Sequence, residues 1–133
     1  MLSPGEGKQY SELFKKHVVK NEETGNKKRI PADSVNKILR CAEDLEVSML
    51  YAIWERVIEE NLADGQPTKY LKESQFYMAC KLVALYQKHY NELMTCSQYG
   101  KTINDVLPPE KINEYIQKAF QFYAKFDMDK FDQ

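Results

Sequence analysis

The chain carries one local pattern twice: a polar loop, a short stretch that suits a β-strand, and then an amphipathic segment. The first loop is "KNEETGNKK", which runs into "KRI" at 28–30, and the second is "NLADGQPTK", which runs into "KYL" at 69–71. Glycine, asparagine and proline break packed structure in such loops. Elsewhere apolar residues recur at spacings of three and four, the period of a helix with one buried face. The repeated pattern restricts the chain to a helical fold with two short strands.

We predict five helices and an all-α fold. The expected helices cover about 7–18, 31–44, 46–60, 72–94 and 110–126. Pro31 suits the first position of the second helix, and "INDVLPPEK" is expected to be extended at its double proline. Helix, loop, short strand and helix, given twice, is the layout of a pair of EF-hands whose loop strands pair. A plain helical bundle with two polar loops would give a similar pattern.

Composition limits the possible function classes. A chain of 133 residues is one domain with a single ordinary core. Its net charge of -1 gives no global field that favours nucleic acid. The charge is nevertheless uneven, because residues 42–64 are acidic with Arg56 as their one base, whereas residues 15–29 are mainly basic. Such charge runs are most often solvated faces.

The cysteines and the hydropathy pattern indicate a soluble, cytoplasmic protein. Three cysteines without C-x-x-C spacing are expected to be reduced, and two of them, Cys41 and Cys80, lie among apolar helix residues. No apolar run has the length of a membrane span. The N-terminus "MLSPGEGKQY" lacks the apolar core of a secretory signal.

Trp54, the single tryptophan, lies in the middle of "EVSMLYAIWERVIEE". The apolar residues of this segment have helical spacing, and such stripes usually exist to be buried. Periodicity alone therefore favours a core role for Trp54, while a role in the wall of a pocket stays open.

Four segments, taken in order, carry a resemblance to a known family. They are "YSELF" (10–14), "IPADSVNKIL" (30–39), "LEVSMLYAIWERV" (45–57) and "YLKESQFYMACKLVALYQ" (70–87). With "VLPPEKI" (106–112) as a closing proline segment, the chain resembles an EH domain over about residues 8–112. EH domains are EF-hand pairs of endocytic and membrane-recycling proteins. The resemblance implies a flexible N-terminus at 1–7, the EH-like unit at 8–112, an additional helix at 113–126 and an acidic tail at 127–133.

The resemblance implies an adaptor that recognises peptides in endocytosis or vesicle trafficking. EH domains bind short turns containing Asn-Pro-Phe and place the Phe in a pocket between their second and third helices. The family's pocket positions fall here on Val35, Leu39, Leu50 and Trp54, with Tyr51 at the rim. Residues one helical turn apart share a face, so each of the pairs Val35–Leu39 and Leu50–Trp54 agrees with this placement. The partners are then Asn-Pro-Phe-containing trafficking proteins.

Three features depart from the family pattern. Tyr51 stands where many EH domains have a small residue, and one extra residue precedes Leu45. The acidic run around Trp54 gives the hypothesis that ligands with a nearby Lys or Arg are preferred.

Metal binding is not expected in either loop. An EF-hand loop needs oxygen ligands at fixed positions and a bidentate Glu at its end. Weak candidates in the second loop are Glu59, Asn61 and Asp64, but the closing position holds Gln75, whose neutral amide cannot replace the carboxylate. The first loop has lysines among its would-be ligands. We expect no cofactor and no calcium.

Other functions were weighed beside peptide binding. No catalytic motif is present, and His17 and His89 are isolated, so an enzyme is not expected. A membrane-surface module that binds phosphoinositides is an alternative, because bases near an anionic surface each add about 1 kcal/mol. The bases concerned are Lys15, Lys16, Lys20, Lys27, Lys28 and Arg29.

A structural oligomerisation domain with a non-functional pocket is the other alternative. Its interface would use aromatic residues of the last helix, of which Phe122 and Phe126 fall partly off the apolar face. The isolated domain is nevertheless expected to be a monomer.

Overall fold

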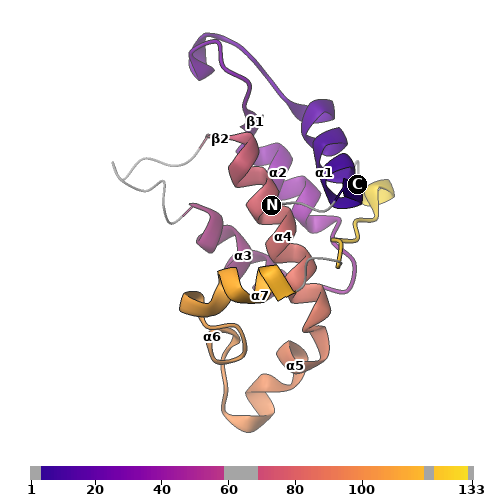
Figure 1. The fold of residues 1–133 in the computed structure, drawn as a ribbon, viewed down its shortest axis with the longest axis vertical. Helices are drawn as coiled ribbons and strands as arrows, with labels where there is room; N and C mark the ends of the chain where they lie inside the picture. The colour runs from indigo at the N-terminus through magenta and orange to yellow at the C-terminus, as the bar shows by residue number, and fades with distance from the viewer. Residues whose placement is uncertain (1–3, 59–68, 119–121, 132–133) are drawn as a thin grey trace.

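A computed structural model describes residues 4–58, 69–118 and 122–131 of the chain. The described part is mostly helical, with one small antiparallel sheet. The α-helices and strands, in chain order, are α1 Pro4–His17, β1 Ile30–Pro31, α2 Ala32–Arg40, α3 Val47–Ile58, β2 Tyr70–Leu71, α4 Glu73–Lys88, α5 Tyr90–Thr95, α6 Ile103–Val106 and α7 Ile112–Lys118 (Figure 1). Short 3-10 turns lie between several of them.

The two predicted strands pair. Ile30 faces Leu71 and Pro31 faces Tyr70 in an antiparallel register, so each strand begins one or two residues later than the sequence indicated. Both Ile30 and Leu71 are fully buried, which fixes the register, because a shift of one residue would expose them. Pro31 itself lies in the strand and caps α2, which begins at Ala32. The sheet joins the start of α2 to the start of α4.

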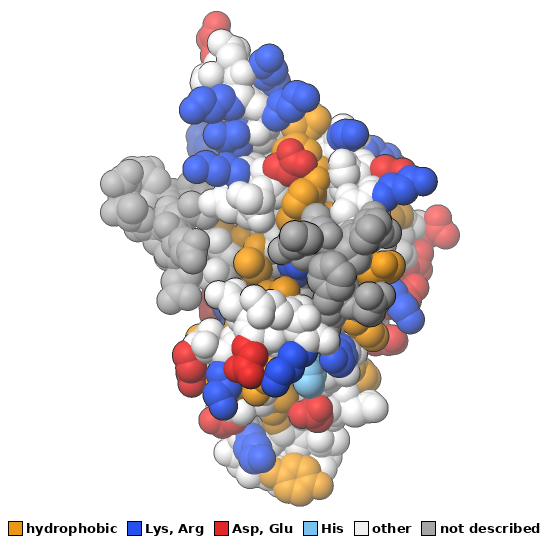
Figure 2. Space-filling model, viewed as in Figure 1, with side chains coloured by type: hydrophobic (Ala, Val, Ile, Leu, Met, Phe, Trp, Pro, Cys, Tyr) orange, Lys and Arg blue, Asp and Glu red, His pale blue; other side chains and the backbone are white. Residues whose placement is uncertain are grey.

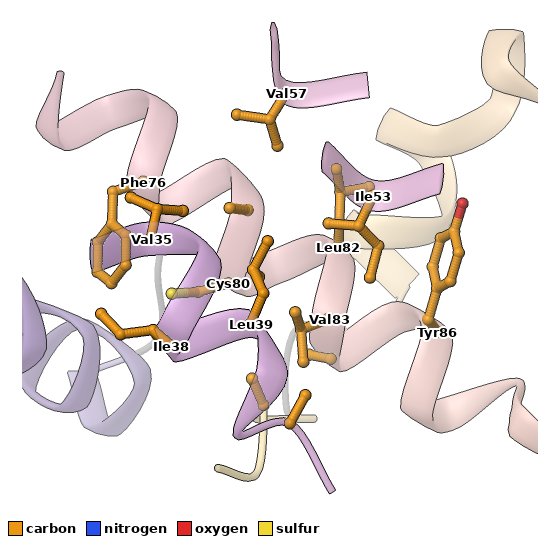
Figure 3. Packing of buried hydrophobic residues seen from close by; sticks show 14 of the residues in the cluster. Val35, Ile38, Leu39, Ile53, Val57, Phe76, Cys80, Leu82, Val83 and Tyr86 are labelled. Atoms are coloured by element: carbon orange, nitrogen blue, oxygen red, sulfur yellow. The ribbon is translucent and has the colours of Figure 1, made fainter. Parts of the chain in front are cut away.

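The core forms around α4, which runs through the middle of the molecule (Figure 1). This helix buries residues on most of its circumference and packs against α1, α3 and α7. Figure 3 shows Ile38 and Leu39 of α2 and Ile53 of α3 within the same buried cluster as the α4 residues Phe76 and Tyr86. Burying a side chain of this size contributes about 1.5–3 kcal/mol. The contact of α3 with α4, and the burial of α2 side chains in the same cluster, therefore hold α2 and α3 in place.

The first helix is longer than predicted. It begins at Pro4, inside the stretch 1–7 that the sequence indicated as flexible. A proline is accommodated in the first turn because its missing N–H has no helical partner there.

The long fourth helix is divided in two. The sequence predicted one helix over 72–94, but α4 ends at Lys88 and α5 begins at Tyr90 after a turn at His89. Leu93 of α5 and Cys96 directly after it are buried. All three cysteines are buried, and within the described residues none of them forms a disulfide.

The C-terminal helix is shorter than predicted. α7 comprises Ile112–Lys118, and residues 122–125 are not helical, although the sequence predicted helix to 126. Instead, residues 122–131, here named the C-terminal strap, pack back on the bundle. Phe126 forms an isolated antiparallel bridge with Ala42, and Asp127 N–H donates to the carbonyl of Cys41 at 2.7 Å.

Two side chains of α1 hold the backbone of the strap. Ala124 N–H donates to the hydroxyl of Tyr10 at 3.0 Å, and Gln9 Nε2 donates to the Ala124 carbonyl at 3.0 Å. These tertiary bonds replace the helical bonds that the periodicity predicted. The strap ends at Phe131, whose ring lies 4.7 Å from that of His17, so the described part of the predicted acidic tail is packed.

Candidate functional site

A pocket of about 520 Å³ lies between α2 and α3. It is lined by Asn36, Leu39, Arg40, Val47, Leu50, Tyr51 and Trp54. Four of the five residues predicted for a peptide pocket are therefore together in this lining. They come from two helices that the loop Cys41–Glu46 connects and that the core holds against each other.

The lining residues form a floor, walls and a rim. Leu39 is only 3% exposed and supplies the floor. Leu50 and Trp54 are half-buried and lie one turn apart on α3, so both contribute to the core cluster and to the wall. Tyr51 and Val47 are 65% and 66% exposed, an unusual exposure for large apolar side chains that places them at the rim. An aromatic or aliphatic side chain of about the size of Phe suits this space.

Val35 does not line the pocket. It is 0% exposed and belongs to the same buried cluster as Phe76 and Cys80 (Figure 3). The resemblance placed it at the site, and its spacing of one turn from Leu39 agreed with this, but at that turn the helix face is covered by the core. Its role is to support the floor from below.

Asn36, Arg40 and Val47 line the pocket but were not among the predicted residues. Asn36 and Arg40 follow Val35 and Leu39 directly in the chain, so they occupy the neighbouring row of α2, one turn apart from each other. The opening of the pocket is therefore rotated toward the polar side of α2. The sequence signal that could have identified Asn36 and Arg40 is their spacing of one helical turn beside an apolar pair with the same spacing.

The acidic residues do not lie where the charge run suggested. Glu55 lines a different hollow of about 610 Å³ on another side of α3, together with Arg56 and residues of α6. Glu46 is exposed and is not part of the pocket lining between α2 and α3. A helix distributes neighbouring residues over all its faces, which is why the described acids Glu46 and Glu55 of this run do not lie together in the pocket lining.

Arg56 fastens the closing proline segment to α3. Its Nη2 donates to the carbonyl of Leu107 at 2.7 Å and to Asn104 Oδ1 at 2.8 Å. The guanidinium also lies 5.7 Å from the centre of the Tyr86 ring, within cation–π range. Pro108 is extended, as predicted, whereas Leu107 closes α6 with its N–H donating to the Ile103 carbonyl and is fully buried. These contacts hold the far side of α3 and leave the pocket side uncovered by this segment.

The predicted basic residues surround the first loop. Figure 2 shows Lys and Arg side chains gathered at the end of the molecule that carries this loop. Five of the six are exposed, namely Lys15, Lys16, Lys20, Lys27 and Lys28. Arg29 differs, because it is half-buried and its Nη1 donates to the Lys28 carbonyl at 2.8 Å.

The first loop has an ordered backbone. Val19 and Arg29 exchange two backbone hydrogen bonds of 2.7 and 2.9 Å, which close the base of the loop. Gly25 at φ +66° makes the turn that other residues rarely adopt. The hydroxyl of Tyr70 donates to Glu23 at 2.6 Å, and this bond raises the pKa of Tyr70, with burial as a smaller cause. The second strand is thereby tied to the first loop.

The weak metal candidates Glu59, Asn61 and Asp64 lie outside the described residues. Within the described ranges, no group of three His, Cys, Asp or Glu side chains is placed to hold a metal ion. Gln75, at the position where an EF-hand would place its Glu, accepts a hydrogen bond from the N–H of Lys72 at 2.7 Å. This amide therefore caps the start of α4.

The two histidines take part in packing. His89 lies at the turn between α4 and α5, with Nδ1 3.1 Å from a carboxylate oxygen of Glu92. His17 is half-buried under Phe131.

None of the helices in the described ranges is long and apolar enough to span a bilayer. Comparisons of the chain with protein-family models, with curated proteins and with solved structures found no match.

Proposed function

We propose that this chain is an EF-hand pair of the EH type and acts as a cytoplasmic adaptor for short peptides of the Asn-Pro-Phe class. The two helix–loop–strand–helix units with antiparallel strands support the EF-hand assignment. The pocket between α2 and α3 carries the functional proposal, because its floor and walls are apolar and its rim exposes Tyr51 and Val47. Large exposed apolar side chains beside a hollow are typical of a binding site.

The apolar area that the pocket can bury sets the expected affinity for a peptide. One buried Phe side chain contributes about 1.5–3 kcal/mol, and ordering the peptide offsets part of that gain. A single motif is therefore expected to bind with micromolar or weaker affinity. Repeated motifs in a partner would raise the apparent affinity through effective concentration.

The proposal is tested by titrating the protein with an Asn-Pro-Phe peptide while recording Trp54 fluorescence and backbone amide shifts. Saturable shifts confined to α2 and α3 are expected. Trp54→Ala should abolish them in a variant that stays folded. Tyr99→Ala is the matched control, because Tyr99 is 74% exposed and lies outside the pocket. No shift at millimolar peptide would refute peptide binding at this site.

Binding to an anionic membrane surface is a second candidate, favoured by the exposed lysines around the first loop. Some EH domains bind phosphoinositides, so this activity is compatible with the first. The test is co-sedimentation with vesicles containing phosphoinositide, with neutral vesicles as the reference. Binding should fall at high salt, where exposed charges are screened, and in the double variant Lys27→Gln, Lys28→Gln. Equal sedimentation of the variant and the wild type would count against this candidate.

A further inference from the structure

Arg40 is the one charged side chain in the described lining of the pocket between α2 and α3. It occupies the last residue of α2 and is exposed. Within the described residues, no hydrogen bond of its guanidinium and no ion pair within 4.0 Å is found. A guanidinium presents a planar fork of donors that matches a carboxylate with two parallel bonds. The pocket therefore combines an apolar wall with one available cation.

The acidic residues nearest in the chain do not neutralise Arg40. Glu43, Asp44 and Glu46 belong to the loop after α2 and are exposed, and none of them lines the pocket. The backbone N–H of Glu43 donates to the Lys125 carbonyl of the C-terminal strap at 3.0 Å, which holds this part of the loop to the strap. Exposed charges act weakly on one another through water and salt, whereas a bidentate pair acts at contact. A charged side chain bound in the pocket therefore interacts more strongly with Arg40 in the lining than with the acidic residues outside it.

The position of Arg40 sets where an anion would lie on a bound peptide. Arg40 and Val47 stand at the two ends of the connecting loop and so mark the same end of the pocket. Along α3, Trp54 lies about 10 Å from Val47, and Leu50 lies about one turn from Val47. An extended peptide advances about 3.3–3.6 Å per residue. One or two residues therefore separate a side chain held at Leu39 and Leu50 from a group that reaches Arg40.

We propose that the ligand of this pocket carries an Asp or Glu one or two residues from its apolar anchor, paired with Arg40. This inference rests on the proposed peptide function and reverses the preference for basic ligands that the acidic run predicted. The source of the anion is an acidic side chain of a continuing peptide, because the lining extends along α3 on both sides of Leu50.

The test compares four labelled Asn-Pro-Phe peptides by fluorescence anisotropy at low and physiological salt. Three are amidated and carry Asp, Asn or Lys at both of the two positions after the Phe, and the fourth carries Asn at both positions and a free carboxylate at its end. The Asp peptide should bind about two- to fivefold more tightly than the Asn peptide at low salt, with a smaller ratio at physiological salt. The Lys peptide should bind most weakly.

Variants of Arg40 assign the effect to this side chain. Arg40→Gln should reduce the ratio of the Asp and Asn dissociation constants to about one, and Arg40→Glu should invert the order so that Lys binds best. Lys88→Gln changes the net charge equally on an exposed residue outside the pocket and should keep the wild-type ratio. Amide spectra show whether each variant is folded.

Each other result has a distinct meaning. Equal binding of the Asp and Asn peptides, or a ratio unchanged in Arg40→Gln, overturns the inference and leaves the peptide function standing. A gain with the free carboxylate alone assigns the anion to a chain end and overturns the acidic side chain. No binding of any peptide at millimolar concentration overturns the proposed function and this inference together.

Discussion

The side-chain amide of Gln87 bonds both backbone groups of Lys125: its Oε1 accepts the N–H at 2.9 Å and its Nε2 donates to the carbonyl at 2.8 Å. One glutamine on α4 thus supplies the bonds that an adjacent β-strand would supply. The same Nε2 also donates to the Glu43 carbonyl at 2.9 Å. Gln87 therefore links α4, the loop after α2 and the C-terminal strap.

Gln87→Ala is expected to lower the free energy of unfolding by about 1–2 kcal/mol, because it leaves the backbone groups of Lys125 without these partners. Urea denaturation followed by circular dichroism measures the change. Gln98→Ala is the control, since Gln98 is exposed and no hydrogen bond of its side chain is found in the described structure. Identical midpoints for the two variants would contradict the linking role of Gln87.

Arg56→Lys is expected to loosen the closing proline segment. A lysine cannot reproduce the two bonds that Arg56 Nη2 makes to Leu107 and Asn104. We expect a loss of about 1–3 kcal/mol and faster amide hydrogen exchange in α6 and in the turn that follows. Arg29→Lys should have a smaller effect, because within the described residues the Arg29 side chain bonds only to the carbonyl of its neighbour Lys28. Unchanged exchange in Arg56→Lys would argue against the anchoring role.

Tyr86→Phe is expected to leave stability at pH 7 unchanged or slightly higher. The hydroxyl of Tyr86 is buried, and within the described residues it has no hydrogen-bond partner. Removing such a group costs no bond and relieves its desolvation. The ring and its contact with Arg56 are kept. A loss of more than about 1 kcal/mol would show that the hydroxyl has a partner.

The same substitution should alter the stability at high pH. Burial raises the pKa of Tyr86 above 10, and the nearby Arg56 lowers it to a smaller extent. Above pH 10 the unfolded chain therefore releases this proton more readily than the folded chain, so the contribution of Tyr86 to stability is present below pH 10 and is lost as the pH rises beyond it. Denaturation curves between pH 9 and about 11 should show a smaller decline for Tyr86→Phe than for the wild type. Other tyrosines with raised pKa, such as Tyr70, leave part of the decline in place.

Asp44→Gly is expected to stabilise the protein. Asp44 has φ +61°, the left-handed conformation, in which a side chain costs energy and glycine does not. We expect a gain of about 0.5–1 kcal/mol, which thermal denaturation would detect. Asp44→Ala removes the same charge but keeps a Cβ, so it should not stabilise. A gain in both variants would assign the effect to charge.

The sequence predicted most of the scaffold because its signals are local. The strands around Ile30 and Leu71, the start of α2 next to Pro31 and the extended Pro108 all follow from residue types within a few positions.

The parts that the sequence did not predict depend on distant partners. No glycine or proline marks the turn at His89, where α4 gives way to α5. The residues 122–126 keep helical spacing, yet their backbone bonds to Gln9, Tyr10 and Gln87 far away in the chain. Periodicity reports which residues are apolar and cannot report which side chains bind the backbone.

The candidate site shows the same limit. The resemblance pointed to Leu39, Leu50 and Trp54, and their helical spacing agreed with it, because the pocket is partly a continuation of the apolar core. The rotation of α2 decides that Asn36 and Arg40 face the opening and that Val35 faces inward. That rotation is set by the buried cluster that α2 shares with α3 and α4, which no single helix encodes.

The C-terminal strap also has a consequence for the order of events in folding. Its bonds to Gln9 and Tyr10 join positions 115 and 114 residues apart, so they require the closure of almost the whole chain. The entropy of that closure is lost before the contacts form, which places them after the local helices and the α2–α3 pair. Substitutions in the strap should then accelerate unfolding and leave the refolding rate nearly unchanged. The strap would thus lengthen the lifetime of the native state by slowing unfolding.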